Sequence, residues 1–511
     1  MRISLRVVQL GAIAVVVAVT TFFTFELDRF FVPKELVLHA TAVLAALLAL
    51  RTLREATATT IDRLLAGYVG LGVLSAAFAT NRWLGMRALA IGASSVLLFW
   101  IARRLRDAGL ARPLVAALAI AVVAIAVTSL LQTYGLETTL FSENRSPGGT
   151  LGNRNYVAHA AAFGLPLVLL AALGAQRRFA LGAAGAAIAT ASLVLTRSRA
   201  AWLAFAAVVV VFLIATIASP PLRRDGRTWR RLFATIVFVA AGVAAALFLP
   251  NALRWRSRNP YLQSVKHVTD YESGSGRGRL VQYEQSLRMA LHHPLLGVGP
   301  GNWAVDYPKF AARHDPSLSD GDPGMTTNPW PSSDWIAWIA ERGVAAFVLI
   351  ALAFLGIAAS GVRQLRAAQT AEEGLAAAAL LATVAGACVT GLFDAVLLLA
   401  LPSFLVWSAM GALLATPAEG ARRAPLPVLA IVAMVLISAA GAARSAMQIA
   451  AMHFYDGGAI ARAARVDPGN YRAQLRLARG GGRTRCEHAR AAYALFPNAV
   501  AAKQVLRGCR D

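Results

Sequence analysis

The sequence predicts an all-α polytopic membrane protein, and both its composition and the lengths of its apolar blocks lead to this prediction. Of the 511 residues, 57% are hydrophobic and only 15% are charged, and the mean hydropathy is +0.57. Ordinary soluble domains carry about 25% charged residues, so the composition argues against a soluble enzyme. The apolar blocks are about 17 to 22 residues long, enough for a helix to cross a hydrocarbon core roughly 30 Å thick.

Hydropathy predicts twelve or thirteen membrane-spanning helices. The first apolar block is too long for the core of a signal peptide, and no small-x-small cleavage site follows Phe25, so we expect an uncleaved anchor. The thirteen predicted spans are 7–25, 36–52, 64–80, 84–102, 113–133, 156–175, 179–196, 201–218, 233–249, 338–360, 374–393, 396–415 and 427–446.

The placement of the arginines predicts the orientation. With a cytoplasmic N-terminus, the inside loops collect twenty arginines, whereas the short outer connections hold mainly five cations. The formal net charge of +24 is therefore largely a topology signal, and we predict no nucleic-acid binding. The inside set is Arg2, Arg6, Arg51, Arg54, Arg63, Arg103, Arg104, Arg106, Arg112, Arg177, Arg178, Arg223, Arg224, Arg227, Arg230, Arg231, Arg363, Arg366, Arg422 and Arg423; the outer set is Arg29, Lys34, Arg82, Arg197 and Arg199.

This orientation divides the chain into a transmembrane domain, residues 1–446, and a periplasmic helical tail, residues 447–511. It also places the 134–155 loop and a long loop over about 250–337 on the periplasmic side. Loops longer than about 15 residues are usually functional or disordered, and the Tyr and Trp content of the long loop favours order.

The tail contains a weak internal repeat, because Ala461 to Asn470 is echoed by Ala489 to Asn498. An Ala-rich helix followed by Pro-Asn and another helix resembles tetratricopeptide hairpins, which bind proteins; the alternative is a helical pair with no binding role. An antiparallel hairpin would bring Cys486 next to Cys509, and the oxidising periplasm favours a disulfide between them. Cys388 lies within a span, and we expect it to stay reduced.

Two outer segments carry arginines in pairs. Thr196-Arg-Ser-Arg-Ala200 joins two spans with almost no loop, and Arg277 and Arg279 precede a short helix in the long loop. A guanidinium binds phosphate oxygens bidentately, so these pairs predict an anion clamp. The alternative for Arg197 and Arg199 is snorkelling to lipid phosphates.

Other outer motifs have structural explanations. Asn153 or Asn155 can cap the next span, and Ser332 or Ser333 can cap the helix that begins near Asp334. The glycines of Gly297-Val-Gly-Pro-Gly301 follow no strand and precede no Gly-Lys-Ser/Thr ending, so they are not a nucleotide loop. His292 and His293 lack a third ligand, and we expect neither a metal nor a cofactor.

Several of these motifs, in this order, resemble the bacterial O-antigen ligase and polymerase superfamily over roughly residues 60–415. The resemblance is carried by Gly149-Thr-Leu-Gly-Asn-Arg-Asn155, Ser198-Arg199, Gly278-Arg279-Leu280 and above all His293-Pro-Leu-Leu-Gly-Val-Gly-Pro-Gly-Asn-Trp303. It implies an inner-membrane glycosyltransferase that uses an undecaprenyl-diphosphate-linked glycan donor without a metal. It also implies that Arg199 and Arg279, with Arg197 and Arg277 as alternates, hold the donor diphosphate.

The chain departs from the family at one position. Counting back from Glu341 and Gly343 places Ser332 where the family has a histidine. A serine hydroxyl cannot replace imidazole as a base near neutral pH. The role then falls to Asp334 or to a loop histidine such as His314 or His293, or the acceptor is a different one, or the activity is lost.

The resemblance leaves the acceptor open between lipid A core, a protein and another glycan, so a ligase, a polymerase and a protein oligosaccharyltransferase all remain. The competing classes are a transporter of lipid-linked sugars and an inactive scaffold. A transporter predicts repeated halves with ionisable groups near the midplane, whereas here the ionisable residues gather at outer ends. We expect a multi-pass protein of the bacterial inner membrane, in contact with membrane lipids, whose tail is periplasmic and available to a periplasmic protein.

Overall fold

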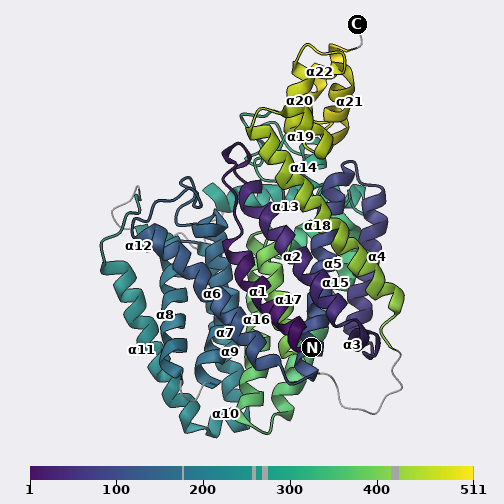
Figure 1. The fold of residues 1–511 in the computed structure, drawn as a ribbon. Helices are drawn as coiled ribbons and strands as arrows, with labels where there is room; N and C mark the ends of the chain where they lie inside the picture. The colour runs from purple at the N-terminus through teal and green to yellow at the C-terminus, as the bar shows by residue number, and fades with distance from the viewer. Residues whose placement is uncertain (175–177, 256–259, 267–273, 416–424, 510–511) are drawn as a thin grey trace.

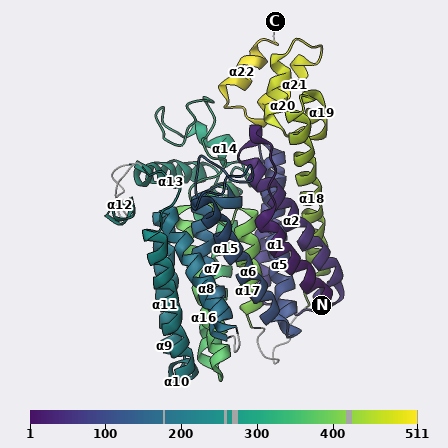
Figure 2. The same cartoon turned by 60° about the vertical axis from the view of Figure 1, so that its left-hand side comes forward.

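The computed structural model describes residues 1–174, 178–255, 260–266, 274–415 and 425–509. Within these residues every regular element is helical, and long helices run side by side to form one bundle (Figures 1 and 2). The helices of the bundle are α1 (Arg2–Val17), α2 (Asp28–Leu48), α4 (Thr60–Ala77), α5 (Arg82–Asp107), α6 (Ala111–Thr133), α7 (Arg154–Gly174), α8 (Phe179–Thr196), α9 (Arg199–Ala218), α11 (Gly226–Phe248), α15 (Asp334–Ala367), α16 (Ala371–Phe393), α17 (Ala400–Leu413) and α18 (Val428–Asp456).

Each predicted span overlaps one of these helices, which confirms the all-α membrane fold. Ten of them, within the described residues, are long and apolar enough to cross a membrane. The other three are α1 with 16 residues, α4 with 18 and α17 with 14. Of the predicted inside arginines, Arg177, Arg422 and Arg423 lie outside the described residues.

The first two spans are shifted from their predicted ranges. α1 ends at Val17 and not at residue 25, while α2 begins at Asp28 and not at residue 36. Arg29 and Lys34, expected in an outer connection, are therefore buried in the first turns of α2. Burial is possible because Arg29 pairs with Glu26 at 2.7 Å and Lys34 donates to the carbonyl oxygens of Ala18 and Thr150. Hydropathy could not predict this burial, because Arg29 and Lys34 also donate to the distant carbonyl oxygens of Thr139 and Thr150.

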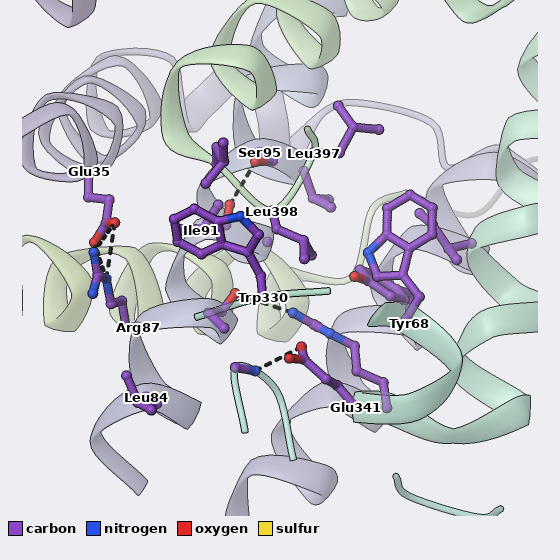
Figure 3. A pocket seen from close by; sticks show the side chains of 18 of the residues that line it. Glu35, Tyr68, Leu84, Arg87, Ile91, Ser95, Trp330, Glu341, Leu397 and Leu398 are labelled. Atoms are coloured by element: carbon purple, nitrogen blue, oxygen red, sulfur yellow. Dashed lines mark hydrogen bonds and ion pairs between the residues drawn. The ribbon is translucent and has the colours of Figure 1, made fainter. Parts of the chain in front are cut away.

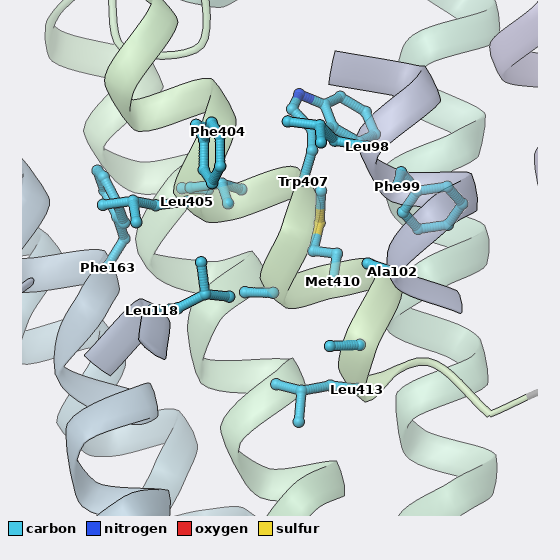
Figure 4. Close-up of a cluster of buried hydrophobic side chains, with 14 of the residues drawn as sticks. Leu98, Phe99, Ala102, Leu118, Phe163, Phe404, Leu405, Trp407, Met410 and Leu413 are labelled. Carbon is cyan, nitrogen blue, oxygen red and sulfur yellow. The ribbon is translucent and has the colours of Figure 1, made fainter. Parts of the chain in front are cut away.

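The core of the bundle surrounds α17. This helix is short, but all of its residues from Ala400 to Leu413 are buried (Figure 4). Phe404 and Trp407 are among the large side chains that it packs against α5, α6 and α7. A helix covered by protein on all sides needs no lipid-facing length, which explains why 14 residues suffice.

The motif that carried most of the resemblance is a backbone clamp on α15. Gly343 interrupts α15 with φ 78° and ψ 173°, and the segment from Gly297 to Trp303 folds onto this kink. Val298 N–H donates to the Ala340 carbonyl at 3.0 Å, and Glu341 accepts from the backbone N–H groups of Gly301 and Trp303. A Cβ on Gly297 would lie 2.3 Å from the carbonyl carbon of Glu341, so only glycine fits this approach.

One end of the bundle carries most of the loop structure. Helices α12 (Pro260–Lys266), α13 (Gly274–His292) and α14 (Trp303–Asp306) lie there together with the tail, whereas the N-terminus and α10 (Pro220–Arg224) lie toward the opposite end (Figures 1 and 2). We call the end with α13 and the tail the outer end. The segments predicted to be periplasmic thus share one end of the molecule.

The tail comprises α19 (Ile460–Val466), α20 (Tyr471–Arg479), α21 (Arg485–Leu495) and α22 (Val500–Arg507). It continues directly from α18, which runs without a break past residue 447. Cys486 and Cys509 form a disulfide with Cα atoms 5.5 Å apart, which confirms the predicted neighbours, and Cys388 is a free thiol.

The tail is docked on the outer loops. Asn498 donates from its side-chain amide to the Val305 carbonyl at 2.7 Å, and Val500 N–H donates to Pro323. A buried ion pair joins Arg444 of α18 to Asp467 at 2.6 Å. These contacts hold the tail against the loop that leads into α15.

Candidate functional site

Arginines surround a cavity of about 460 Å³ at the outer end of the bundle. Arg197, Arg199 and Arg279 line it, as the sequence predicts, together with Arg154, which sequence reasoning did not select. Asn155, Ser198, Ala200, Gln263, Ser264 and Ser275 complete the lining, with no carboxylate among these residues. We call this space the arginine cavity; its lining is suited to binding an anion of considerable size.

The tight turn between α8 and α9 positions two of the four arginines. Arg197 occupies the left-handed region with φ 57°, a conformation that costs a non-glycine residue about 1–2 kcal/mol. In this position its guanidinium lies 4.7 Å from the centre of the Trp255 ring, and its Nε donates to Ser264 Oγ at 3.0 Å. Arg199 begins α9 and donates to Ser275 Oγ at 2.9 Å.

The other two arginines come from helix N-termini. Arg154 is the first residue of α7, where its guanidinium lies 5.1 Å from the centre of the same Trp255 ring. The capping of α7 is as predicted, because Asn153 Oδ1 accepts from Asn155 N–H at 3.0 Å. Arg279 lies in the second turn of α13, which begins at Gly274. Arg277 is exposed on the same helix and does not line the cavity. Of the two arginines predicted on this helix, only Arg279 therefore belongs to the cavity lining.

Asp394 is the carboxylate that the structure brings close to Arg279. It follows the last residue of α16, in the turn that leads to α17, and its Oδ1 accepts from the Ala395 N–H at 2.9 Å. Burial raises its pKa to about 6, while the positive charges of Arg279 and Arg145 act to lower it. Sequence reasoning missed Asp394; the available signal was a lone carboxylate between two apolar blocks at the outer end.

Asp334 has a structural role in the fold. Its carboxylate is 1% exposed and accepts hydrogen bonds from the backbone N–H groups of Val396 and Leu397 at 2.9 to 3.0 Å. Ser333 is the N-cap of α15 and also donates to the Gly391 carbonyl at 2.8 Å. Together these residues fix the turn that carries Asp394, and neither lines the arginine cavity.

Ser332, which the sequence resemblance predicts at a histidine position, is half-buried beside this turn. Its backbone N–H donates to Gln282 of α13, and its carbonyl accepts from the hydroxyl of Tyr283 at 2.7 Å. Tyr283 also donates to the Leu392 carbonyl, two residues before Asp394. Ser332 therefore lies where α13, α15 and the end of α16 meet.

The loop histidines are placed differently. His314 is exposed in the loop after Lys309, and His293 is exposed at the end of α13. His292 donates from its Nδ1–H to the Arg288 carbonyl oxygen at 2.8 Å. None of the three lines the arginine cavity.

Comparison with known proteins identifies the region that holds most of this site. No curated protein matches the chain. The family model for O-antigen ligase matches residues 184–351, which include Arg197, Arg199, Arg279 and Ser332 but neither Arg154 nor Asp394. This match supports the O-antigen ligase superfamily for this region of the chain, and with it ligase-type glycan transfer in surface polysaccharide assembly.

Proposed function

We propose that the protein transfers a glycan from an undecaprenyl-diphosphate donor to an acceptor hydroxyl at the periplasmic face of the inner membrane. The single observation that carries this proposal is the arginine cavity, because Arg279 in its lining acts electrostatically on the buried carboxylate of Asp394. The cavity gathers the positive charges of four arginines at the end of the bundle where both a lipid-linked donor and a polar acceptor can arrive.

In the proposed reaction the acceptor oxygen attacks the anomeric carbon of the donor sugar. The bond between that carbon and the diphosphate oxygen breaks, and undecaprenyl diphosphate leaves with the electron pair. The acceptor proton passes to Asp394 and later to solvent. Arg199 and Arg279 hold the diphosphate, and Arg154 and Arg197 add positive charge around it.

The arginines would stabilise the charge that develops on the leaving group. A diphosphate gains negative charge as its bond to carbon breaks, and preorganised cations stabilise that change most strongly in the transition state. We propose that these guanidinium groups take the part that a divalent metal plays in many glycosyltransferases, so that added chelator should leave the rate unchanged.

Asp394 fits the role of base in the absence of the family histidine. A pKa of about 6 leaves its carboxylate ionised near neutral pH and still basic enough to accept a proton. Asp334 is less suited because its oxygens already accept backbone hydrogen bonds. His314 is less suited because it is exposed in a loop and no described contact joins it to Arg279.

A deletion strain tests the proposed function directly. Loss of the gene should leave undecaprenyl-linked glycan accumulated on the periplasmic side and surface polysaccharide undelivered, and the wild-type gene should restore delivery. If the protein is a transporter, deletion of the gene would instead trap the linked glycan on the cytoplasmic side. If it is an inactive scaffold, replacing only the arginines would leave the level of undecaprenyl-linked glycan unchanged. Either result would overturn the proposal.

The proposed orientation makes a separate prediction. Alkaline phosphatase fused after Arg507 should be active because the tail is periplasmic, while the same enzyme fused within α10 should be inactive. The phosphatase folds only in an oxidising compartment, so its activity reports the side of the membrane. Activity in the α10 fusion together with inactivity after Arg507 would reverse the orientation and with it the proposed location of the site.

A further inference from the structure

A second cavity, of about 80 Å³, lies among α2, α4, α5, α15 and α17, and it is not part of the arginine cavity. We call it the inner cavity. Figure 3 shows Trp330 projecting into its centre, with Glu35 and Arg87 on one side and Tyr68 and Glu341 on the other. The proposed roles of Arg279 and Asp394 use none of these side chains.

Arg342 is the unusual member of the lining. Only 2% of its side chain is exposed, and its Nη2 donates to the Ala88 carbonyl at 3.2 Å. Its Nε and Nη1 are buried with no hydrogen-bond partner in the part of the chain that the structure describes. Burying donors of a cation without acceptors costs several kcal/mol, so such groups usually serve a ligand or water.

The kink at Gly343 explains why Arg342 points into this space. Its neighbour Glu341 is held by the N–H groups of Gly301 and Trp303, so the clamp fixes the backbone on either side of Arg342. The guanidinium lies 4.7 Å from the centre of the Tyr68 ring, on the cavity wall. The clamp therefore does more than stabilise the fold, because it also holds the guanidinium of Arg342 in place as a hydrogen-bond donor to the cavity.

The charges of the lining favour a polyhydroxyl ligand over an anion. Arg87 is already paired with Glu35 at 2.8 Å and with Asp28 at 3.0 Å. The lining holds two carboxylates, Glu35 and Glu341, and two arginines, Arg87 and Arg342, so its formal charges balance. A free oxyanion would be repelled by both carboxylates, whereas a hydroxyl can accept from Arg342 and donate to a carboxylate.

The aromatic lining fits the same ligand. Trp330 and Trp338 both line the cavity, and large aromatic faces with a few polar groups are typical of sites for small organic ligands. A sugar ring presents apolar C–H faces and hydroxyl edges, which match the tryptophans and the charged groups respectively. The volume is enough for one end of a sugar residue and too small for an extended oligosaccharide.

The turn between α16 and α17 connects the inner cavity to the proposed base. Asp394 begins this turn, and Leu397, Leu398 and Leu399, which follow it, line the inner cavity. On the cavity wall, Trp330 packs edge-on against Phe31 at 5.1 Å between ring centres. A ligand in the cavity therefore lies against the same short turn that carries Asp394.

We propose that the inner cavity binds the terminal sugar of the acceptor glycan, with Arg342 donating hydrogen bonds to its hydroxyl groups. This inference rests on the proposed function, and it makes Arg342 a specificity-determining residue. It selects a glycan acceptor over a protein side chain, because a serine or threonine hydroxyl lacks the ring that the tryptophans accommodate.

A pair of glycine substitutions tests the proposal without removing any charged group. A Cβ at Gly92 of α5 would lie 3.6 and 3.8 Å from the guanidinium of Arg342, so Gly92→Leu fills the cavity. Gly70 of α4 is the matched control, because a Cβ there meets nothing within 4 Å. Gly92→Leu should raise the acceptor KM roughly tenfold or more and leave the donor KM unchanged, and Gly70→Leu should change neither. The proposal fails if the acceptor KM is the same in both variants.

A binding measurement separates this inference from the proposed function. Ser95 lines the cavity, so Ser95→Cys places a thiol there, and Cys388→Ala removes the free thiol found elsewhere in the described chain. The alkylation rate of the new thiol then reports whether the inner cavity is occupied. Methyl glycosides of common hexoses should slow alkylation saturably, and adding Arg342→Gln should abolish this protection. Protection by inorganic phosphate and not by glycosides would identify an anion site and overturn the inference. Glycoside protection in a protein that transfers no glycan would overturn the proposed function and leave the sugar site standing.

Discussion

Alanine at Arg279 should nearly abolish glycan transfer while leaving the amount of protein in the membrane unchanged. Arg279 lines the arginine cavity and lies close enough to Asp394 to lower its pKa. Loss of one preorganised group that stabilises a leaving oxyanion typically costs about 100- to 1,000-fold in kcat. We expect a similar loss for Arg199→Ala. The measurement is transfer of purified lipid-linked glycan by reconstituted full-length protein.

The matched control comes from the same helix. Arg288 of α13 is exposed and pairs with Glu284 at 2.6 Å, so Arg288→Ala removes an equal charge away from the cavity and should leave kcat near that of wild type. Near-normal rates in both Arg279→Ala and Arg199→Ala would remove the diphosphate assignment. A rate lost on chelation and restored by a divalent metal would contradict the proposed metal independence.

The fold could be predicted from the sequence because the length and charge of each apolar segment largely decide whether it spans a membrane. A span must satisfy its own backbone hydrogen bonds, so hydropathy predicts a helix wherever it predicts a span. The prediction was wrong at α1 and α2, because buried cations such as Arg29 and Lys34 count against a span until their partners are known. Those partners lie in loops about a hundred residues away, near Thr139 and Thr150.

The site could be predicted from the sequence only in part, for a related reason. Arg197 and Arg199 stand out because cations at an outer helix end violate the expected charge bias, and this signal is local. The proximity of Asp394 to Arg279 depends on how the end of α16 packs beneath α13, which no spacing in the sequence encodes. Asp334 illustrates the opposite case: it has the residue type of a base, but its backbone partners Val396 and Leu397 are visible only in three dimensions.

Asn at position 394 should reduce transfer by about 100- to 10,000-fold, the usual range for loss of a general base. Asparagine keeps the carbonyl oxygen that accepts from Ala395 N–H, so the turn between α16 and α17 should stay folded. Binding of the donor should change little because the four arginines remain. Steady-state rates and donor binding, measured on the same reconstituted protein, distinguish this outcome from misfolding.

The pH profile decides whether Asp394 accepts the proton. With a pKa of about 6, the carboxylate is active above that pH and is protonated below it, so kcat/KM should fall as the pH drops through about 6. Arg145 lowers the pKa of Asp394, so Arg145→Gln removes a positive charge and should move this acid limb to higher pH. An acid limb that stays in place in Arg145→Gln, or that persists in the residual activity of Asp394→Asn, would show that another group titrates. Ser332→His introduced into the Asp394→Asn protein then offers a direct comparison, because an imidazole there would restore the family pattern at the junction of α13 and α15.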